Sequence, residues 1–232
     1  MKVVALVQAR LGSSRLPGKM LLRLRGLPLI DWVTRRAGAA AMLNGLVVAT
    51  TDRARDDPLA EHLARQGVAV FRGPEDDVLE RFRRAGEWAE ATHLVRVCAD
   101  NPLIWGGAVD ELIRRYRELA EREDPDRLYV YNHIPRNNLW PDGLGAEMIS
   151  FPLLASLARK AVLPEHREHC LSYIWDHAED FELRTFDPAD PRLRRPEIKL
   201  DVDTPADYRR LALMPLTPAS PPEEVVRLYI PE

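Results

Sequence analysis

Cations, glycines and serines are concentrated in one short segment near the start of the chain. Directly after the apolar run Val3–Val7 comes Ala9-Arg10-Leu11-Gly12-Ser13-Ser14-Arg15-Leu16-Pro17-Gly18-Lys19. If the run is a strand of an open α/β sheet, this segment lies beyond its carboxyl end, where such sheets bind ligands. Glycines there let backbone N–H groups approach phosphate oxygens, and Arg10, Arg15 and Lys19 can balance the phosphate charge. The segment therefore predicts a binding site for a phosphorylated ligand.

The spacing in this segment differs from two common phosphate motifs. Five residues lie between Gly12 and Gly18, and Met20 follows Lys19 where a Walker loop has serine or threonine. The glycine spacing also fails the dinucleotide-binding fingerprint. The alternative is a surface loop that is basic only because the chain uses arginine in place of lysine. We therefore expect a phosphate site of another kind.

Two carboxylates stand where later strands are expected to end. Asp100 follows the apolar stretch 93–99, and Asp203 closes the segment 197–203. Mg²⁺ prefers oxygen ligands and is commonly held by one or two carboxylates together with substrate phosphates. Taken alone, Asp100 could equally be a turn residue, because asparagine and proline follow it. Together the two positions predict a magnesium site.

The sequence around Asp203 leaves its side chain free for such a role. Thr204 is a suitable helix N-cap, Pro205 fits the first helical position, and Asp207 falls three residues after the cap. Capping therefore does not require Asp203. In an extended strand Asp201 points to the same face and could help Asp203 or substitute for it.

Alternating apolar runs and amphipathic stretches must position these residues. With 232 residues and 46% hydrophobic content, the chain suits one folded domain. Through the first half the alternation is typical of β-α-β units around a largely parallel sheet. The expected strands are 2–8, 45–50, 68–72, 93–98 and 127–132, and the expected helices are 28–41, 57–66, 75–91 and 108–121.

The alternation changes in the second half. We expect residues 132–186 to be an insertion for acceptor binding or dimerisation within a single domain of residues 1–214, followed by a proline-rich tail at 215–232. The insertion is expected to hold strands at 146–150 and 182–186 and helices at 152–161 and 165–177. After it, a strand at 197–203 and a final helix from Thr204 complete the domain.

Charge and cysteine content narrow the class of protein. The chain has 33 basic and 36 acidic residues, so it lacks the excess positive charge that draws proteins onto nucleic acid. No run approaches the length of a membrane helix, so we expect no membrane partner. Two distant cysteines suit a reducing, cytoplasmic location.

His166, His169 and Cys170 could form half of a zinc site, but no second pair accompanies them.

The whole set of motifs resembles a known group of enzymes. The segment Gln8–Lys19 is similar to that of the sugar cytidylyltransferases, including the 3-deoxy-manno-octulosonate and acylneuraminate enzymes and above all the spore coat polysaccharide biosynthesis protein F family. The resemblance continues to about residue 213 and so covers nearly the whole chain. It is carried by Val47–Thr51, Val70–Leu79, Asp100–Ile104, Pro141–Leu144, Arg167–His169 and Val202–Pro205.

This resemblance implies a Rossmann-like, glycosyltransferase-A-type nucleotide-diphosphosugar transferase fold with a mixed central sheet. It implies CTP as the nucleotide, Mg²⁺ on Asp100 and Asp203, and catalytic roles for these two residues with Arg15 and Lys19. Asp142, Glu147 and His169 are implied as contacts to the sugar. The implied nucleotide-binding residues are Ala9, Arg10, Gly12, Ser13, Ser14, Arg15, Lys19, Thr50 and Arg72.

The chain departs from its relatives at three positions. Ala99 and Asn101 flank Asp100 where these relatives usually carry glycine and cysteine, which leaves the aspartate itself intact. Gly145 stands where an acidic residue is common. Because of the departure at Gly145, the resemblance does not identify the acceptor.

We therefore expect a cytidylyltransferase that transfers CMP from CTP to a sugar or sugar-acid acceptor and releases pyrophosphate, for surface polysaccharide synthesis. One alternative is a glycosyltransferase that consumes a nucleotide sugar, although the Asp-x-Asp motif usual in such enzymes is missing beside Asp100. Another is a nucleotide-binding protein without turnover.

We also expect a homodimer whose interface uses the apolar side chains of the insertion, Tyr131, Leu139, Trp140, Tyr173, Ile174 and Trp175.

Overall fold

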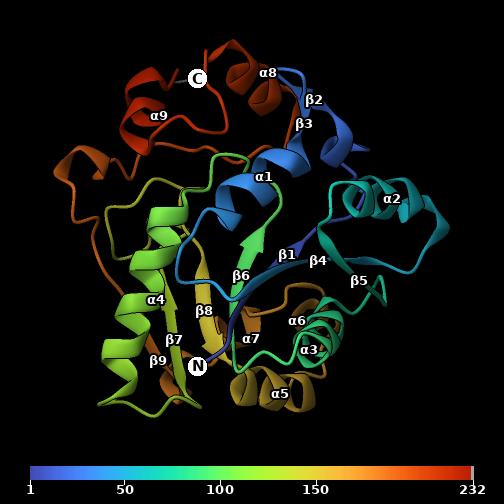
Figure 1. The fold of residues 1–232 in the computed structure, drawn as a ribbon. Coiled ribbons are helices and arrows are strands. Elements are labelled where there is room, and N and C mark those ends of the chain that lie inside the picture. Colours follow the sequence, from blue (N-terminus) through green and yellow to red (C-terminus); the bar gives the residue numbers. More distant parts are fainter. Residues whose placement is uncertain (231–232) are drawn as a thin grey trace.

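A seven-stranded sheet with helices on both faces forms the body of the molecule (Figure 1). This computed structural model describes residues 1–230. The strand order is β5-β4-β1-β6-β8-β7-β9. The strands are β1 (Val3–Gln8), β4 (Gly45–Thr51), β5 (Ala69–Gly73), β6 (His93–Cys98), β7 (Leu128–Tyr131), β8 (Glu147–Ser150) and β9 (Glu182–Thr185).

The sheet is mixed, as the family resemblance implies. Strands β1, β4, β5 and β6 pair in parallel, and β7 pairs in parallel with β9. Strand β8 lies between β6 and β7 and runs antiparallel to both. The segment expected to be an insertion thus supplies β8 and β9 to the central sheet.

Alternate residues of β1 divide the core into two faces. Val3, Ala5 and Val7 pack against α1 (Leu29–Gly38), α2 (Asp57–Arg65) and α4 (Gly106–Ala120). On the opposite face, Val4 and Leu6 pack against α3 (Val78–Trp88) and α5 (Phe151–Lys160). Successive side chains of a strand point to opposite faces, so a run of consecutive apolar residues marks a strand covered on both.

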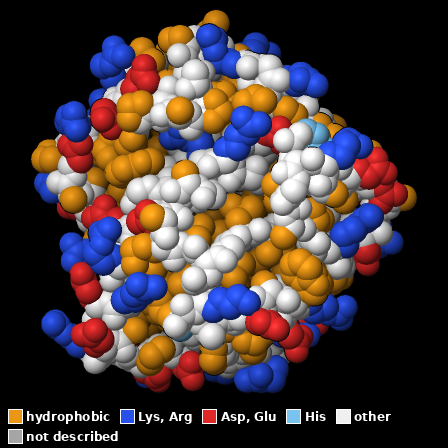
Figure 2. Space-filling model, viewed as in Figure 1, with side chains coloured by type: hydrophobic (Ala, Val, Ile, Leu, Met, Phe, Trp, Pro, Cys, Tyr) orange, Lys and Arg blue, Asp and Glu red, His pale blue; other side chains and the backbone are white. Residues whose placement is uncertain are grey.

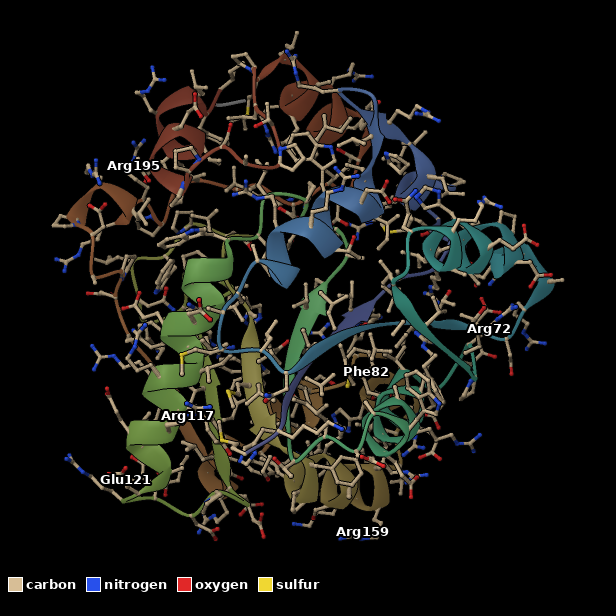
Figure 3. The ribbon with its side chains drawn as sticks, in the orientation of Figure 1. Arg72, Phe82, Arg117, Glu121, Arg159 and Arg195 are labelled. Carbon is tan, nitrogen blue, oxygen red and sulfur yellow. The ribbon has the colours of Figure 1, made fainter. Side chains whose placement is uncertain are left out.

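The side chains labelled in Figure 3 follow the same division. Phe82 of α3 lies between its helix and the sheet and is 2% exposed. Arg117 and Glu121 at the end of α4, Arg159 at the end of α5 and Arg195 point outward at the periphery. The amphipathic pattern of these helices therefore places charge outside and apolar bulk on the sheet.

A third apolar cluster lies where the C-terminal segment covers the end of the sheet. It includes Trp32 of α1, Trp140 and Val225 of the last helix, all nearly or wholly buried. The helices here are α8 (Pro205–Leu213) and α9 (Pro222–Leu228), and 3-10 turns occur at Lys19–Leu21, Ala54–Asp56, Ala178–Asp180 and Pro191–Leu193. A short hairpin, β2 (Arg23–Leu24) and β3 (Leu27–Pro28), also packs at this end.

Two expected elements are wrong in detail. The expected helix over 165–177 is two short helices, α6 (Pro164–Glu168) and α7 (Ser172–Asp176), because the backbone leaves helical geometry at His169. The expected strand over 197–203 makes only one isolated bridge, between Lys199 and Asp142. Its alternating apolar residues face the third cluster, which gives the strand-like pattern without a ladder.

The apolar residues expected at a dimer interface are largely internal. Trp140 and Ile174 are wholly buried within the chain, and Tyr131 is 2% exposed. Of the expected set, Leu139 is exposed, and Tyr173 and Trp175 are half-buried. Tyr131, Trp140 and Ile174 therefore belong to the core of this chain, and the prediction that they form an interface is wrong.

The surface carries both signs of charge. Figure 2 shows basic and acidic side chains dispersed around the periphery, with apolar side chains exposed between them. Within residues 1–230 there is no helix of sufficient length and apolar character to span a membrane.

Candidate active site

A cavity of about 570 Å³ opens at the carboxyl ends of β1 and β6. Gln8 of β1 and Cys98 of β6, which are register partners, both line it. The even-numbered residues of these strands face α3 and α5, so the cavity lies on that face of the sheet. Its lining consists of Gln8, Ala9, Arg10, Gly12, Ser13, Ser14, Arg15, Lys19, Met20, Arg96, Cys98, Ala99, Asp100, Glu168, His169 and Asp203.

The glycine-containing segment forms one wall of the cavity and is held closed by its own backbone. The Ser13 and Gly18 N–H groups both donate to the Leu11 carbonyl, at 2.9 and 3.0 Å. Gly18 has a φ of 70°, a left-handed conformation that side-chain-bearing residues rarely adopt. These contacts bring Gly18, and with it Lys19, back beside Leu11 at the start of the loop.

Asp56 fixes the same loop from outside the cavity. Its carboxylate is wholly buried and accepts hydrogen bonds from the Leu11 N–H, at 2.6 Å, and from the Thr51 hydroxyl. Gly12 lies directly under the Arg55 guanidinium, and a Cβ there would come 2.8 Å from Arg55 Nη2. The loop is thus positioned by residues at the start of α2.

Lys19 joins the two carboxylates that the sequence assigns to a metal. Its Nζ donates to the Val202 carbonyl at 2.8 Å and lies 3.3 Å from Asp203 Oδ1 and 3.8 Å from Asp100 Oδ2. Arg15 Nη1 reaches the other Asp203 oxygen at 2.9 Å. The structure therefore brings Arg15, Lys19, Asp100 and Asp203 together in one cavity.

Backbone contacts explain why Asp203 lies beside Asp100. The Val202 N–H donates to the Asp100 carbonyl at 2.7 Å. Thr204 and Asp207 form the predicted capping box of α8, and the Asp207 carboxylate also accepts from the Asp203 N–H at 3.1 Å. The cap thus holds the backbone of Asp203 and leaves its side chain to the cavity.

The two carboxylates suit Mg²⁺, which takes hard oxygen ligands. Both approach the same ammonium, so a cation position between them already exists. Within residues 1–230 no group of three or more histidine, cysteine, aspartate or glutamate side chains could hold a metal. Further ligands would therefore be phosphate oxygens and water. His166, considered for zinc from the sequence, contacts Asp176 through Nε2 at 2.8 Å.

The floor of the cavity is a buried polar cluster on β1, β6 and β8. Arg96 pairs with its register partner Glu147, and Glu147 also accepts a hydrogen bond from the Tyr129 hydroxyl. Burial alone would raise the pKa of the Glu147 carboxyl, but the Arg96 charge and these hydrogen bonds lower it overall. Glu147 is therefore an ionised partner beneath the floor, and Arg96 is the residue that lines the cavity.

The end of α6 forms the opposite rim. Arg167 anchors it to the N-terminus of α3 through the Asp77 carboxylate and to α5 through the Ala158 carbonyl. The next residue, Glu168, reaches across to Arg10 Nη2 at 3.3 Å. His169 lines the cavity where the helix stops, so α6 delivers these two side chains to the site.

Four of the residues assigned from the resemblance lie outside the cavity lining. Thr50 is wholly buried, and its hydroxyl has no hydrogen-bond partner. Arg72 donates to the Thr51 and Arg53 carbonyls and pairs with Asp57. Asp142 and Glu147 are the other two.

Asp142 belongs to an acidic group beside the site. Burial and, after it, the charge of Asp201 raise the pKa of its carboxyl to about 7, while Lys199 acts in the opposite direction. Its backbone bonds to the 198–200 segment, with the Leu200 N–H donating to the Asp142 carbonyl at 3.0 Å.

Gly145 has a structural reason for lacking a side chain. A Cβ at this position would overlap the backbone and side-chain oxygens of Asn132. The Asn132 amide oxygen in turn accepts from the Ala146 N–H at 2.9 Å. The departure at Gly145 is therefore a packing requirement of this backbone.

Arg96, Cys98 and Glu168 line the cavity but are not among the residues assigned from the sequence. A signal for two of them exists in the strand 93–98, where side chains two residues apart share a face. Arg96 and Cys98 therefore precede Asp100 on one face. Glu168 lies within the Arg167–His169 motif, whose position on the rim depends on the break in the helix.

Comparison with protein families gives one match that spans most of the chain. Residues 4–214 match the family model described as cytidylyltransferase. The chain is 32% identical over 214 residues to the spore coat polysaccharide biosynthesis protein SpsF of Bacillus subtilis, covering 90% of this chain and 84% of that protein. It is 34% identical over 114 residues to the 3-deoxy-manno-octulosonate cytidylyltransferase of Bdellovibrio bacteriovorus, covering 48% and 44% of the two chains.

Solved structures agree with the sequence comparisons. A cytidylyltransferase from Leptospira borgpetersenii superposes with a TM-score of 0.85 at 28% identity, covering 98% of this chain and 93% of that chain. The CMP:2-keto-3-deoxy-manno-octonic acid synthetase complexed with CTP superposes with a TM-score of 0.67 at 22% identity, covering 91% and 97%. The second match concerns the fold alone.

Proposed function

This chain belongs to the cytidylyltransferase family, and we propose that it transfers CMP from CTP to a sugar-acid acceptor with release of pyrophosphate. The observation that carries the proposal is the convergence of Lys19 with Asp100 and Asp203 in a cavity walled by the glycine-containing loop. Relatives named as 3-deoxy-manno-octulosonate cytidylyltransferases support a sugar acid as acceptor. The relative SpsF supports a place in polysaccharide synthesis.

In this reaction an acceptor oxygen attacks the α-phosphorus of CTP. The new bond joins that oxygen to phosphorus, the bond from the α-phosphorus to the bridging oxygen breaks, and its electron pair leaves with pyrophosphate. Little covalent chemistry falls to the protein, so positioning and charge neutralisation provide the catalysis. An acceptor oxygen that is already ionised would need no general base.

The wall residues have the charges this step requires. Lys19 and Arg15 would offset the charge that develops on the leaving pyrophosphate, and Arg10 would exchange its exposed contact with Glu168 for a phosphate oxygen. The backbone N–H groups of Gly12 and Ser14 would approach the same phosphates, whereas the Ser13 N–H donates to the Leu11 carbonyl.

Asp100 and Asp203 would hold Mg²⁺, which when bound supplies positive charge to the phosphate oxygens. Without Mg²⁺, Lys19 pairs with both carboxylates, and Arg15 adds a second positive charge at Asp203. Lys19 can then turn from the carboxylates to phosphate, because its stem is flexible and its ammonium carries three donors.

Pyrophosphate release tests this proposal. The protein is incubated with CTP, Mg²⁺ and a panel of acidic sugars, and pyrophosphate is measured against reactions that lack the acceptor. Release that requires both CTP and an acceptor supports it. Consumption of a nucleotide sugar would indicate a glycosyltransferase, and CTP binding without release would indicate a nucleotide-binding protein.

Assembly and location follow as parts of the same proposal. Leu139, Tyr173 and Trp175 remain at least partly exposed and could contribute to a homodimer contact. Both cysteines are free thiols, which suits a reducing compartment such as the cytoplasm. Light scattering at high micromolar concentration tests the dimer, and a monomer mass would contradict it.

A further inference from the structure

The floor of the cavity contains a buried ion pair that the phosphate chemistry does not use. The Glu147 side chain is 2% exposed and Arg96 is 19% exposed. Burial lowers the pKa of the neighbouring His133, although the Glu147 charge opposes this, so the imidazole is neutral near pH 7. The floor thus carries one positive and one negative charge.

Such a pair is an unusual way to fill space under a sheet. Removing two charges from water costs several kcal/mol per ion, and well-packed apolar residues are often equally or more stabilising. The neighbours on the same face, Leu94 and Ile149, are apolar and buried. The pair therefore points to a ligand rather than to stability.

Arg96 has hydrogen-bonding capacity left for that ligand. Its Nη1 is bound to Glu147, while Nη2 makes only a long contact of 3.5 Å to Gln8 Oε1. Its buried Nε has no hydrogen-bond partner. A guanidinium offers five N–H donors in a planar fork that matches the two oxygens of a carboxylate.

The guanidinium is also on the correct side of the reaction centre. Arg96 and Cys98 share a strand face, and Asp100 follows at the end of the same strand. The loop cations Arg15 and Lys19 belong instead to the segment after β1, and both contact Asp203. A group bound at Arg96 would therefore belong to the acceptor and not to the triphosphate.

We propose that Arg96 is the specificity-determining residue for the acceptor, holding an acceptor carboxylate, and that Glu147 is a positioning residue that fixes the guanidinium. Tyr129 keeps the Glu147 carboxylate oriented through its hydroxyl. This inference rests on the proposed function, because it concerns the acceptor half of the same cavity.

The test compares two probes, 3-deoxy-manno-octulosonate and its methyl ester, which carries no carboxylate charge, each with CTP and Mg²⁺. The variants are Arg96→Gln and Arg96→Lys. Arg184→Gln is the matched control, because Arg184 pairs with Glu123 and Glu182 away from the cavity. We expect wild type to prefer the acid in kcat/KM. Arg96→Gln should lose about tenfold to a hundredfold with the acid and little with the ester, at an unchanged KM for CTP.

Two further variants distinguish a role in positioning the acceptor from a merely structural role. Arg96→Lys should recover only part of the preference, because an ammonium lacks the planar fork. Glu147→Gln should raise the KM for the acid more than it lowers kcat. Equal losses with the acid and the ester in Arg96→Gln, or a wild type that does not distinguish them, would overturn the inference.

A binding measurement makes the outcome independent of turnover. Thermal unfolding is followed with CMP and either probe in wild type and Arg96→Gln. The inference is supported if the acid, but not the ester, raises the unfolding temperature of wild type and if this rise is absent in Arg96→Gln. This holds even if no pyrophosphate is released. An equal response to both probes overturns it. Absence of pyrophosphate release with every acceptor contradicts only the proposed reaction.

Discussion

Lys19 and Asp203 meet across 184 positions of sequence, with the ammonium 3.3 Å from the carboxylate. Lys19 is 8% exposed and also contacts Asp100. A single ammonium therefore bridges the two aspartates, and Arg15 gives Asp203 a second cationic partner.

Lys19→Met should weaken CTP binding about tenfold to a hundredfold while leaving cytidine binding unchanged, because cytidine has no phosphates to lose. It should also lower the free energy of unfolding by about 1–3 kcal/mol, since Asp100 loses its ammonium partner and Asp203 keeps only Arg15. Lys160→Met is the control, because Lys160 is exposed at the end of α5. Titration calorimetry with both ligands checks this, and equal losses for CTP and cytidine would contradict the phosphate assignment.

Thr204→Ala should lower both stability and activity. Loss of an N-cap costs about 1 kcal/mol, and this cap also holds the backbone of Asp203 through Asp207. Ser150→Ala removes a comparable cap, a 3.0 Å bond to the Leu153 N–H of α5. Chemical denaturation should therefore give similar losses for both variants, with a fall in kcat for Thr204→Ala alone. A similar fall in kcat for Ser150→Ala would refute the link.

Asp142→Asn should change how stability depends on pH. The folded-state pKa of Asp142 is raised from 3.8 to about 7, so the folded protein binds more protons than the unfolded chain between these values. The free energy of unfolding of the wild type then falls as pH rises through this window. Asparagine cannot titrate, so the variant should gain stability relative to wild type from pH 4 to pH 8, in the presence of EDTA.

Asp190 provides the control for that measurement. Its hydrogen bonds to Arg192 lower its pKa, so its titration lies below the window. Asp190→Asn should leave the slope between pH 5 and 8 unchanged. A constant difference between Asp142→Asn and wild type across the window would show that Asp142 is not perturbed.

Gly145→Ala should destabilise the protein by about 1–3 kcal/mol, because the added methyl group overlaps Asn132. Gly145→Glu should be worse and should not improve turnover, although an acidic residue is common there in relatives. Gly45→Ala is the control, since a Cβ at Gly45 meets no atom within 4 Å. Urea denaturation of the three variants measures the effect, and wild-type stability of Gly145→Ala would refute the packing explanation.

Much of the fold and one wall of the site could be predicted from local patterns. The loop after β1 and the Thr204 cap depend on residues close in sequence, so spacing alone reveals them. The segment Glu197–Asp203 shows the limit of this approach. Its alternating Ile198, Leu200 and Val202 fill an apolar cluster, and burial without a pairing strand gives the same period of two.

The floor and rim of the cavity depend on long-range contacts. Arg96 meets Glu147 only because β8 inserts antiparallel beside β6. The helix break at His169 places Glu168 and His169 on the rim, and Arg167 fixes that position through Asp77. The amphipathic side chain of Trp140 is equally suited to an interface and to a core. Only its packing with the C-terminal segment shows that it is buried.

The most direct test of the proposed chemistry is the Mg²⁺ dependence of pyrophosphate release in wild type, Asp100→Asn, Asp203→Asn and the double variant. If both carboxylates serve one ion, each single variant should lose most turnover and the double variant should be scarcely worse, because residues acting on one ion are not additive. Asp201→Asn serves as the comparison, since Asp201 pairs with Lys199. Wild-type activity of Asp203→Asn at limiting Mg²⁺, with loss in Asp201→Asn, would contradict the assignment of the metal to Asp203.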